Sequence, residues 1–324
     1  MLALRLFCGM PNAWWWIGFN ASILVLLALD LGVFNRKSHV LSVRQALGWS
    51  ALWVSLAIGF GLWVGRAMGH QSMLEFYAGY LVEQALSVDN LFVFILIFGY
   101  FKVPRELQHR VLFWGILGAL IMRGIMIGAG AALIARFHAI IYVFGAFLVY
   151  TGFKMAFGGE ASVEPEANPV IRLIRRIFPI TTHMHGDRFF VREPVVAGGA
   201  VRRVATPLFV VLALVETTDV VFALDSIPAV FGVTREPFIV YTSNVFAILG
   251  LRSLFFVLAN VIGKFHLLKY GLSVVLAFIG IKMLLTELYP IPIGLALGVV
   301  AAILLSSVLL SLVIPPKVQT PPSA

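Results

Sequence analysis

Two stretches of this sequence place acidic residues at the same spacing inside long apolar segments. They are Glu83-Gln-Ala-Leu-Ser-Val-Asp89-Asn90 and Asp219-Val-Val-Phe-Ala-Leu-Asp225-Ser226, and in each a polar side chain follows the second acid. An ionised side chain in the middle of a bilayer costs about 2.5–3.5 kcal/mol. These acids therefore require buried partners, a hydrated cavity or a bound cation.

The surrounding composition is that of a membrane protein. Of the 324 residues, 60% are hydrophobic and 12% are charged, and the mean hydropathy is +0.98, whereas soluble domains are about half apolar and a quarter charged. Nine segments have the roughly 20 apolar residues of a helical span. They lie near 14–33, 47–65, 76–99, 111–134, 138–157, 207–231, 238–259, 271–288 and 291–314. The sequence predicts an all-α polytopic membrane protein with about nine transmembrane helices, the first of them retained and not cleaved as a signal peptide.

The basic residues predict the orientation of these spans. Most of the 24 Lys and Arg residues follow spans 1, 3, 5 and 7 or lie in the C-terminal tail. The positive-inside rule then places the N-terminus outside and the C-terminus in the cytoplasm. This asymmetry explains the net charge of +9, and we expect no nucleic-acid partner. Because Cys8 is the only cysteine, a disulfide or a cysteine-built metal site within one chain is excluded.

The similarity between the two acidic stretches continues downstream. Arg123 and Arg252 follow at comparable distances, and Gly152-Phe-Lys154-Met155 then matches Gly280-Ile-Lys282-Met283. Spans 3–5 and 6–8 are therefore predicted to be two copies of one unit, and three spans per copy make this an inverted-topology repeat. The predicted organisation is a two-helix segment (1–70), a first repeat (71–157), a cytoplasmic loop (158–205), a second repeat (206–289), and a final helix with a disordered tail (290–324).

Inverted repeats commonly place a substrate site at mid-membrane, where the copies meet. We therefore expect spans 3 and 6 to face one another and to pool their acids. Helical geometry puts Asp219 and Ser226 on one face, with Asp225 about 120° away, so a regular helix does not converge all of these oxygens. Pro228 offers a cause for a break in span 6, which would leave the carbonyl of Leu224 free as a further ligand.

The candidate ligands are carboxylates, an amide and a hydroxyl. They are Glu83, Asp89, Asn90, Glu216, Asp219, Asp225 and Ser226, with Arg123, Arg252, Lys154 and Lys282 as charge-balancing residues. Such hard oxygen ligands favour magnesium, calcium or manganese over copper or zinc, but ligand type alone does not choose among the three. A buried salt-bridge network is the structural alternative, and we disfavour it because the acids outnumber the nearby bases. His109, His138 and His266 are interpreted as interface residues and not as ligands.

At these residues the chain resembles the TerC family of integral membrane proteins, which includes the Alx subgroup. The resemblance lies in the two acidic stretches, in Glu216-Thr-Thr-Asp219, in Thr242-Ser243-Asn244 and in Lys269-Tyr-Gly-Leu, and it covers roughly residues 14–290. It implies a manganese(II) exporter of a bacterial inner membrane, related to the LysE superfamily. Relatives are associated with tellurite resistance, alkaline response and metal loading of secreted enzymes. The resemblance implicates the same seven candidate ligands.

The leading hypothesis is thus a transporter and not an enzyme, with Mn²⁺ as substrate and no permanent cofactor. Proton coupling is a natural mechanism because carboxylates that bind a metal can release protons. A calcium/proton antiporter is the nearest alternative. A non-transporting scaffold in metal or tellurite stress is another, and it would bind secretion machinery or secreted metalloenzymes through residues 158–205. We interpret that segment, which contains His183 and His185, as a cytoplasmic loop in preference to a metal-sensing domain.

Overall fold

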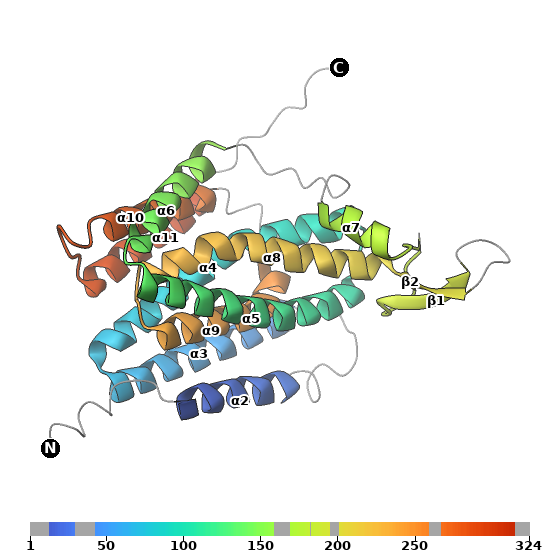
Figure 1. Ribbon diagram of the computed structural model, residues 1–324, viewed down its shortest axis with the longest axis horizontal. Coiled ribbons are helices and arrows are strands. Elements are labelled where there is room, and N and C mark those ends of the chain that lie inside the picture. Colours follow the sequence, from blue (N-terminus) through green and yellow to red (C-terminus); the bar gives the residue numbers. More distant parts are fainter. Residues whose placement is uncertain are drawn as a thin grey trace.

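The computed structural model describes residues 13–29, 43–158, 169–181, 183–194, 201–258 and 267–314. Its helices are α2 (Ala13–Leu29), α3 (Val43–Met68), α4 (His70–Tyr100), α5 (Arg105–Arg136), α6 (Ile140–Phe157), α7 (Pro169–Ile177), α8 (Pro207–Phe231), α9 (Pro237–Leu258), α10 (Leu268–Leu284) and α11 (Ile293–Val313). The strands are β1 (Phe190–Pro194) and β2 (Val201–Ala205). The long helices lie side by side as a bundle, with α7 and the two strands at one end (Figure 1).

The helices coincide with the apolar segments of the sequence. Within the described part of the chain, α3, α4, α5, α6, α8 and α11 are long and apolar enough to cross a membrane, and α2 and α9 contain shorter apolar stretches. Large apolar side chains such as Leu52, Ile125 and Leu305 are exposed on the outside of the bundle, as expected where lipid replaces water. The chain is therefore an all-α polytopic membrane protein.

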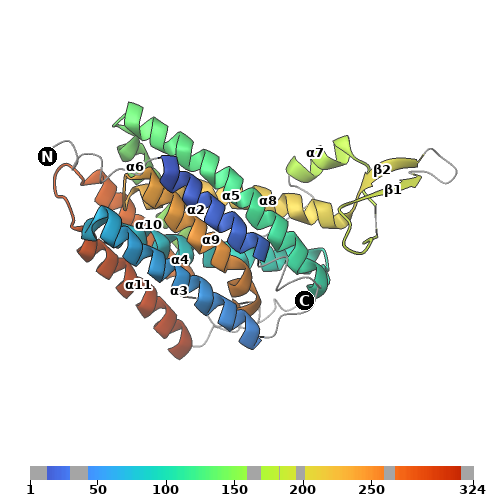
Figure 2. The same ribbon diagram turned by 90° about the horizontal axis from the view of Figure 1, so that it is seen from below.

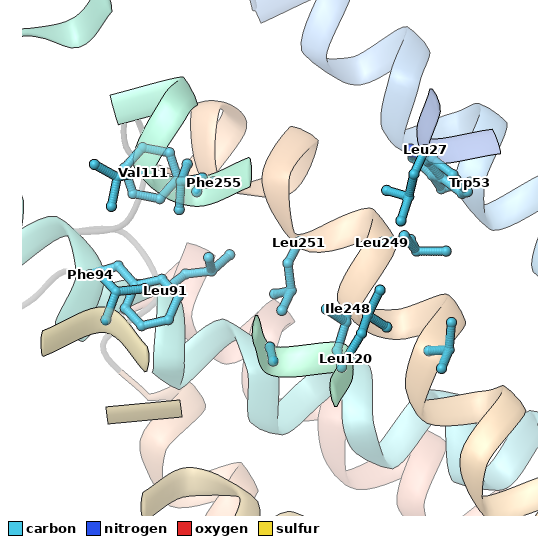
Figure 3. Close-up of a cluster of buried hydrophobic side chains, with 14 of the residues drawn as sticks. Leu27, Trp53, Leu91, Phe94, Val111, Leu120, Ile248, Leu249, Leu251 and Phe255 are labelled. Carbon is cyan, nitrogen blue, oxygen red and sulfur yellow. The ribbon is translucent and has the colours of Figure 1, made fainter. Parts of the chain in front are cut away.

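Helix α9 lies in the centre of the bundle. Every residue from Thr242 to Leu251 is buried, because α3, α4 and α5 all pack against this helix. Figure 3 shows Leu249 beside Trp53 and Leu27 on one side of α9, and Leu251 directed toward Leu91 of α4 on another. The helices α2, α3 and α11 lie along the outer sides of the bundle (Figure 2). The polar residues Thr242, Ser243 and Asn244 of α9 consequently face protein and not lipid.

The helices α6 and α10 approach each other closely through glycines. A Cβ atom added to Gly280 would lie 2.6 Å from the carbonyl oxygen of Gly145, and one added to Gly152 would lie 2.7 Å from the carbonyl oxygen of Ser273. Small residues of this kind let membrane helices pack backbone to backbone. Further contacts between α4–α6 and α8–α10 join α4 to α8 and α9, and α5 to α8 and α9, with smaller contacts between α6 and α8 and between α4 and α10.

The prediction that Pro228 breaks the helix is wrong. Helix α8 runs unbroken from Pro207 to Phe231 with Pro228 inside it. Pro228 lies in the last turn, so its missing N–H removes only the hydrogen bond to Leu224 before the helix ends. Its own carbonyl still accepts a hydrogen bond from the N–H of Gly232 at 2.9 Å. An interrupted helix is therefore not available to gather the acids.

The segment predicted as a cytoplasmic loop contains regular structure. Strands β1 and β2 pair antiparallel from Phe190↔Ala205 to Pro194↔Val201, and α7 packs on α8 through Ile171 and Ile174. The sequence prediction missed these elements. His266 and the part of the predicted disordered tail beyond residue 314 lie outside the described residues.

Candidate functional site

Arg123 lies in the interior of the bundle, where α5 brings it between α4 and α8. It is 1% exposed. Its Nε and Nη2 donate hydrogen bonds to the two carboxylate oxygens of Asp219 at 3.1 and 3.0 Å, and its Nη1 forms a buried ion pair with Glu83. Bidentate pairing of this kind fixes the guanidinium plane as well as its charge. One arginine thus joins an acid of each stretch.

Two further side chains reach the same guanidinium. The Ser226 hydroxyl of α8 and the Asn244 amide oxygen of α9 each lie 3.3 Å from Nη1 of Arg123. We call Glu83, Arg123, Asp219, Ser226 and Asn244 the Arg123 cluster. All five are buried, and together they carry one net negative charge. Four helices therefore meet at a polar, charged site enclosed by the protein.

Helical spacing explains how α4 and α8 supply these groups. Asp219 and Ser226 are seven residues apart and share one face of α8, as the sequence predicts, and both contact Arg123. On α4, Glu83, Ser87 and Asn90 follow the same helical periodicity and all are buried. The site is a polar stripe on each of two apolar helices.

Several polar atoms around the cluster have no partner. Within the described residues, Glu83 Oε2, Ser87 Oγ, Asn90 Nδ2 and Asn244 Nδ2 are buried without a hydrogen bond. Leaving such a group unsatisfied costs about 1–3 kcal/mol, and a concentration of them is unusual in a folded protein. Two of these atoms, Glu83 Oε2 and Ser87 Oγ, are oxygens that a polar or cationic ligand could contact, and the two amide nitrogens are hydrogen-bond donors.

The other predicted acids of α8 lie apart from the cluster. Asp225 accepts a hydrogen bond from Thr151 of α6 at 3.2 Å and lies within electrostatic range of Lys154, in agreement with its 120° offset from Asp219. Glu216 lies against Gly118 of α5, where any Cβ atom would overlap its carboxylate. In the described part of the chain, no hydrogen bond or ion pair satisfies Glu216.

The expected single pool of acids is therefore not present among the described side chains. Arg123 joins only Glu83 and Asp219, and the described residues contain no group of three or more His, Cys, Asp and Glu side chains able to hold a metal ion. The disfavoured salt-bridge network accounts for these two acids, because one buried arginine reaches both α4 and α8. The side chains of Asp89 and Arg252 lie outside the described set.

Sequence reasoning gave no role to Asn244 or Ser87. Asn244 belongs to Thr242-Ser243-Asn244, a polar run inside an apolar span, and all three are completely buried. That interruption of hydropathy was the signal available in the sequence. Ser87 lies one turn after Glu83 on the same face of α4, so helical spacing from the acid would also have identified it.

A small pocket lies beside the cluster, between α4, α5, α8 and α9. Its lining consists of Leu91, Phe94, Leu112, Gly115, Ile116, Ala119, Val215, Asp219, Ile248 and Leu251. Asp219 is the only charged residue among them, and Figure 3 shows four of the apolar ones, Leu91, Phe94, Ile248 and Leu251. One carboxylate of the cluster therefore lies in the wall of an otherwise apolar pocket.

A second polar group lies at the end of the bundle opposite α7 and the strands. Thr234 donates a hydrogen bond to Glu75 at 2.5 Å, and Lys282 donates one to the carbonyl of Gly232 at 3.0 Å. Glu236 lies in the connection between α8 and α9. Burial raises the pKa of its carboxyl, the hydrogen bond from the N–H of Phe238 lowers it, and the negative charge of Glu75 raises it. Lys282 thus belongs to this end and not to the Arg123 cluster.

Comparisons with known proteins agree on one family. The family model for the integral membrane protein TerC family matches residues 68–319. The chain is 52% identical to an uncharacterized membrane protein of Myxococcus xanthus over 94% of this chain and 93% of that one. It is 50% identical to a protein of Photorhabdus laumondii (89% and 91% covered) and 46% identical to one of Escherichia coli K12 (91% and 93%), both named Alx and described as proposed membrane-bound redox modulators. No solved structure matches the chain.

Proposed function

The chain belongs to the TerC family of integral membrane proteins, and we propose that it transports a divalent metal cation, with manganese(II) export as the leading assignment. The observation that carries this proposal is the Arg123 cluster, in which carboxylates from α4 and α8 meet an amide and a hydroxyl oxygen inside the bundle. Hard oxygen donors of this kind suit manganese, magnesium and calcium. The unpaired oxygens Glu83 Oε2 and Ser87 Oγ, and a pocket lined in part by Asp219, support a ligand at this position.

We also propose that α4–α6 and α8–α10 form an inverted repeat within about nine membrane crossings. If α4, α5 and α6 correspond to α8, α9 and α10, exchanging the two copies converts a contact between α4 and α9 into one between α8 and α5. Both contacts are present, which supports the repeat. The sequence match pairs Gly152 with Gly280 and therefore Gly145 with Ser273. Exchanging the two copies therefore converts the close approach of Gly145 to Gly280 into a close approach of Ser273 to Gly152. The structure has both of these close approaches.

The proposed orientation places the end with α7 and the strands in the cytoplasm of a bacterial inner membrane. Arg176, Arg188, Arg192, Arg202 and Arg203 are exposed in this region, as the positive-inside rule favours. The pocket at Asp219 is then the cytoplasmic entrance, and the group around Glu75 and Glu236 faces the outside. Metal passes from the first to the second.

Redox modulation, the activity named for the Alx relatives, fits this chain only as an indirect effect. Direct thiol exchange between two cysteines of one chain needs a second cysteine, and Cys8 is alone. Supply of manganese to enzymes outside the cytoplasm would alter redox balance without any thiol in the transporter. Transport therefore accounts for both the buried acids and the cysteine content.

The test is uptake into everted membrane vesicles that contain a dye sensitive to divalent ions. Manganese added outside should enter vesicles that contain the protein, and an imposed pH gradient should change the rate if protons are exchanged. Calcium and magnesium in parallel assays identify the preferred ion, so faster calcium uptake would favour the calcium/proton antiporter. Failure of every divalent ion to enter faster than into vesicles without the protein would refute transport.

Variants connect transport to the acids. Asp89→Asn and Asp225→Asn should abolish uptake with unchanged membrane insertion, because each removes a carboxylate of the acidic stretches. Glu287→Gln is the matched control, since Glu287 is exposed, far from the acidic stretches in the sequence, and contacts exposed His138 and Tyr142. If deletion of residues 160–200 abolishes function while both acid variants retain it, the scaffold alternative replaces transport.

A further inference from the structure

The position that the proposed function assigns to a metal ion is held in this structure by a side-chain cation. The guanidinium of Arg123 lies between Glu83 and Asp219 and also meets Ser226 and Asn244. We propose that Arg123 is a tethered cation that competes with the transported metal: it holds the two carboxylates in the empty protein and is displaced when a divalent ion enters. This inference rests on the proposed function.

Charge balance favours a metal ion that replaces the guanidinium over a metal ion that binds beside it. Glu83, Asp219 and Arg123 together carry one net negative charge inside the protein. A divalent ion in place of the guanidinium makes the two carboxylates and the ion neutral, whereas a divalent ion added beside it leaves a net positive charge in a medium that solvates charge poorly. A monovalent ion in place of the guanidinium only restores the original charge. Displacement of Arg123 therefore also selects divalent over monovalent cations.

The fit of the guanidinium is good for the acids and poor for the other oxygens. Its hydrogen bonds to Asp219 are 3.0 and 3.1 Å long, but Ser226 and Asn244 lie at 3.3 Å, beyond the usual range for such bonds. Within the described residues, the Asn244 amide nitrogen and one Glu83 oxygen remain without partners. The cluster is thus not built only to neutralise an arginine.

Glu216 is placed to receive the displaced guanidinium. Its carboxylate contacts α5 at Gly118, N-terminal to Arg123 on the same helix, and helical side chains lean toward the N-terminus. It also lies within electrostatic range of Asp219. The guanidinium would exchange one carboxylate partner for another and would never lie unpaired in the interior.

Direct metal binding to the purified protein tests the competition. Calorimetric titration with Mn²⁺ should show that Arg123→Gln binds about tenfold or more tightly than the wild type, because a competing positive charge is gone. Arg123→Lys should return the affinity toward the wild-type value. The control is Arg136→Gln, which alters an exposed arginine at the end of the same helix and should leave binding unchanged.

Two further measurements separate competition from structural support. In proteoliposomes, Arg123→Gln should lose net manganese transport but keep manganese–manganese exchange, because the carrier cannot return without a cation in its site. Glu216→Gln should weaken Mn²⁺ binding in the wild type but not in Arg123→Gln, because only a displaced guanidinium needs the alternative partner. A merely structural arginine would instead lower exchange and net transport together, in proportion to the loss of folded protein.

The outcomes are distinguishable. If the wild type binds and transports manganese but folded Arg123→Gln binds it no more tightly, the tethered-cation proposal is wrong and the proposed function stands. Should Arg123→Gln fail to fold, unchanged Mn²⁺ affinity in Glu216→Gln overturns the proposal on its own. If the wild type neither binds nor transports any divalent ion, the proposed function itself fails and this inference falls with it.

Discussion

The Arg123 cluster and the α6–α10 contact both join α4–α6 to α8–α10, but the first consists of charged and polar side chains and the second of glycines. At the α6–α10 contact, glycines bring two backbones together, and a Cβ on Gly280 would lie 2.6 Å from a carbonyl oxygen. At the cluster, charged and amide groups are buried and several of their atoms have no partner. The difference separates a contact suited to stability from a site suited to binding, and substitutions at the two places should have different consequences.

The largest effect is expected from Asp219→Asn. This change removes the bidentate partner of Arg123, and breaking a buried ion pair from one side costs about 3–5 kcal/mol. The free energy of unfolding in mild detergent should fall by an amount in this range, and manganese uptake should be lost even in the fraction that remains folded. Uptake per folded molecule equal to the wild type would place the site elsewhere.

Gly280→Ala should lower stability without removing transport from the folded protein. The added methyl group meets the backbone of α6, and overpacking of this kind costs about 1–3 kcal/mol. Gly128→Ala on α5 is the matched control, because a Cβ there has no atom within 4 Å and alanine favours a helix by about 1 kcal/mol over glycine. Melting temperatures and uptake per folded molecule check both variants. Similar melting temperatures for the two would remove the distinction drawn between the regions.

Ser226→Ala should be milder than either change. Its hydroxyl lies 3.3 Å from Arg123, so the loss of this weak hydrogen bond should cost no more than about 1 kcal/mol. If the oxygen is a metal ligand, manganese binding should weaken several-fold while stability barely changes. An unaltered manganese affinity would remove Ser226 from the set of ligands.

The smallest effect concerns pH at the end opposite α7 and the strands. Burial and Glu75 raise the pKa of Glu236 above its ordinary value of 4.5, so the folded protein holds this proton more strongly than the unfolded chain. That contribution to stability is complete at low pH and is lost as pH rises through the folded-state pKa. The melting temperature of Glu236→Gln relative to the wild type should therefore rise as pH is raised above about 4.5. A difference that stays constant with pH would show that Glu236 does not titrate in this way.

Hydropathy and helical periodicity predicted much of the fold and part of the site. The apolar segments coincide with helices because lipid requires long apolar runs, and the spacing of Asp219 and Ser226 placed both on the face that meets Arg123. These features depend on residues near one another in the sequence. Local pattern therefore sufficed to find them.

The missed features depend on tertiary position. Arg123 contacts both Glu83 and Asp219 because of the way α4, α5 and α8 pack together. The spacing of these residues along the chain does not predict that packing. The break predicted at Pro228 does not occur because Pro228 lies in the last turn of α8, and the sequence pattern did not show how close the end of the helix is. Asn244 was not assigned a place in the site because its contact with Arg123 depends on how α5 and α9 pack.

The most direct test of the central claim is the location of manganese in a crystal of the protein grown with Mn²⁺, by anomalous scattering. The account predicts an ion between α4 and α8, with oxygens of Glu83 and Asp219 as neighbours and the Arg123 guanidinium moved away from them. An ion bound instead at His183 and His185 near the strands, with the Arg123 cluster unchanged, would contradict it.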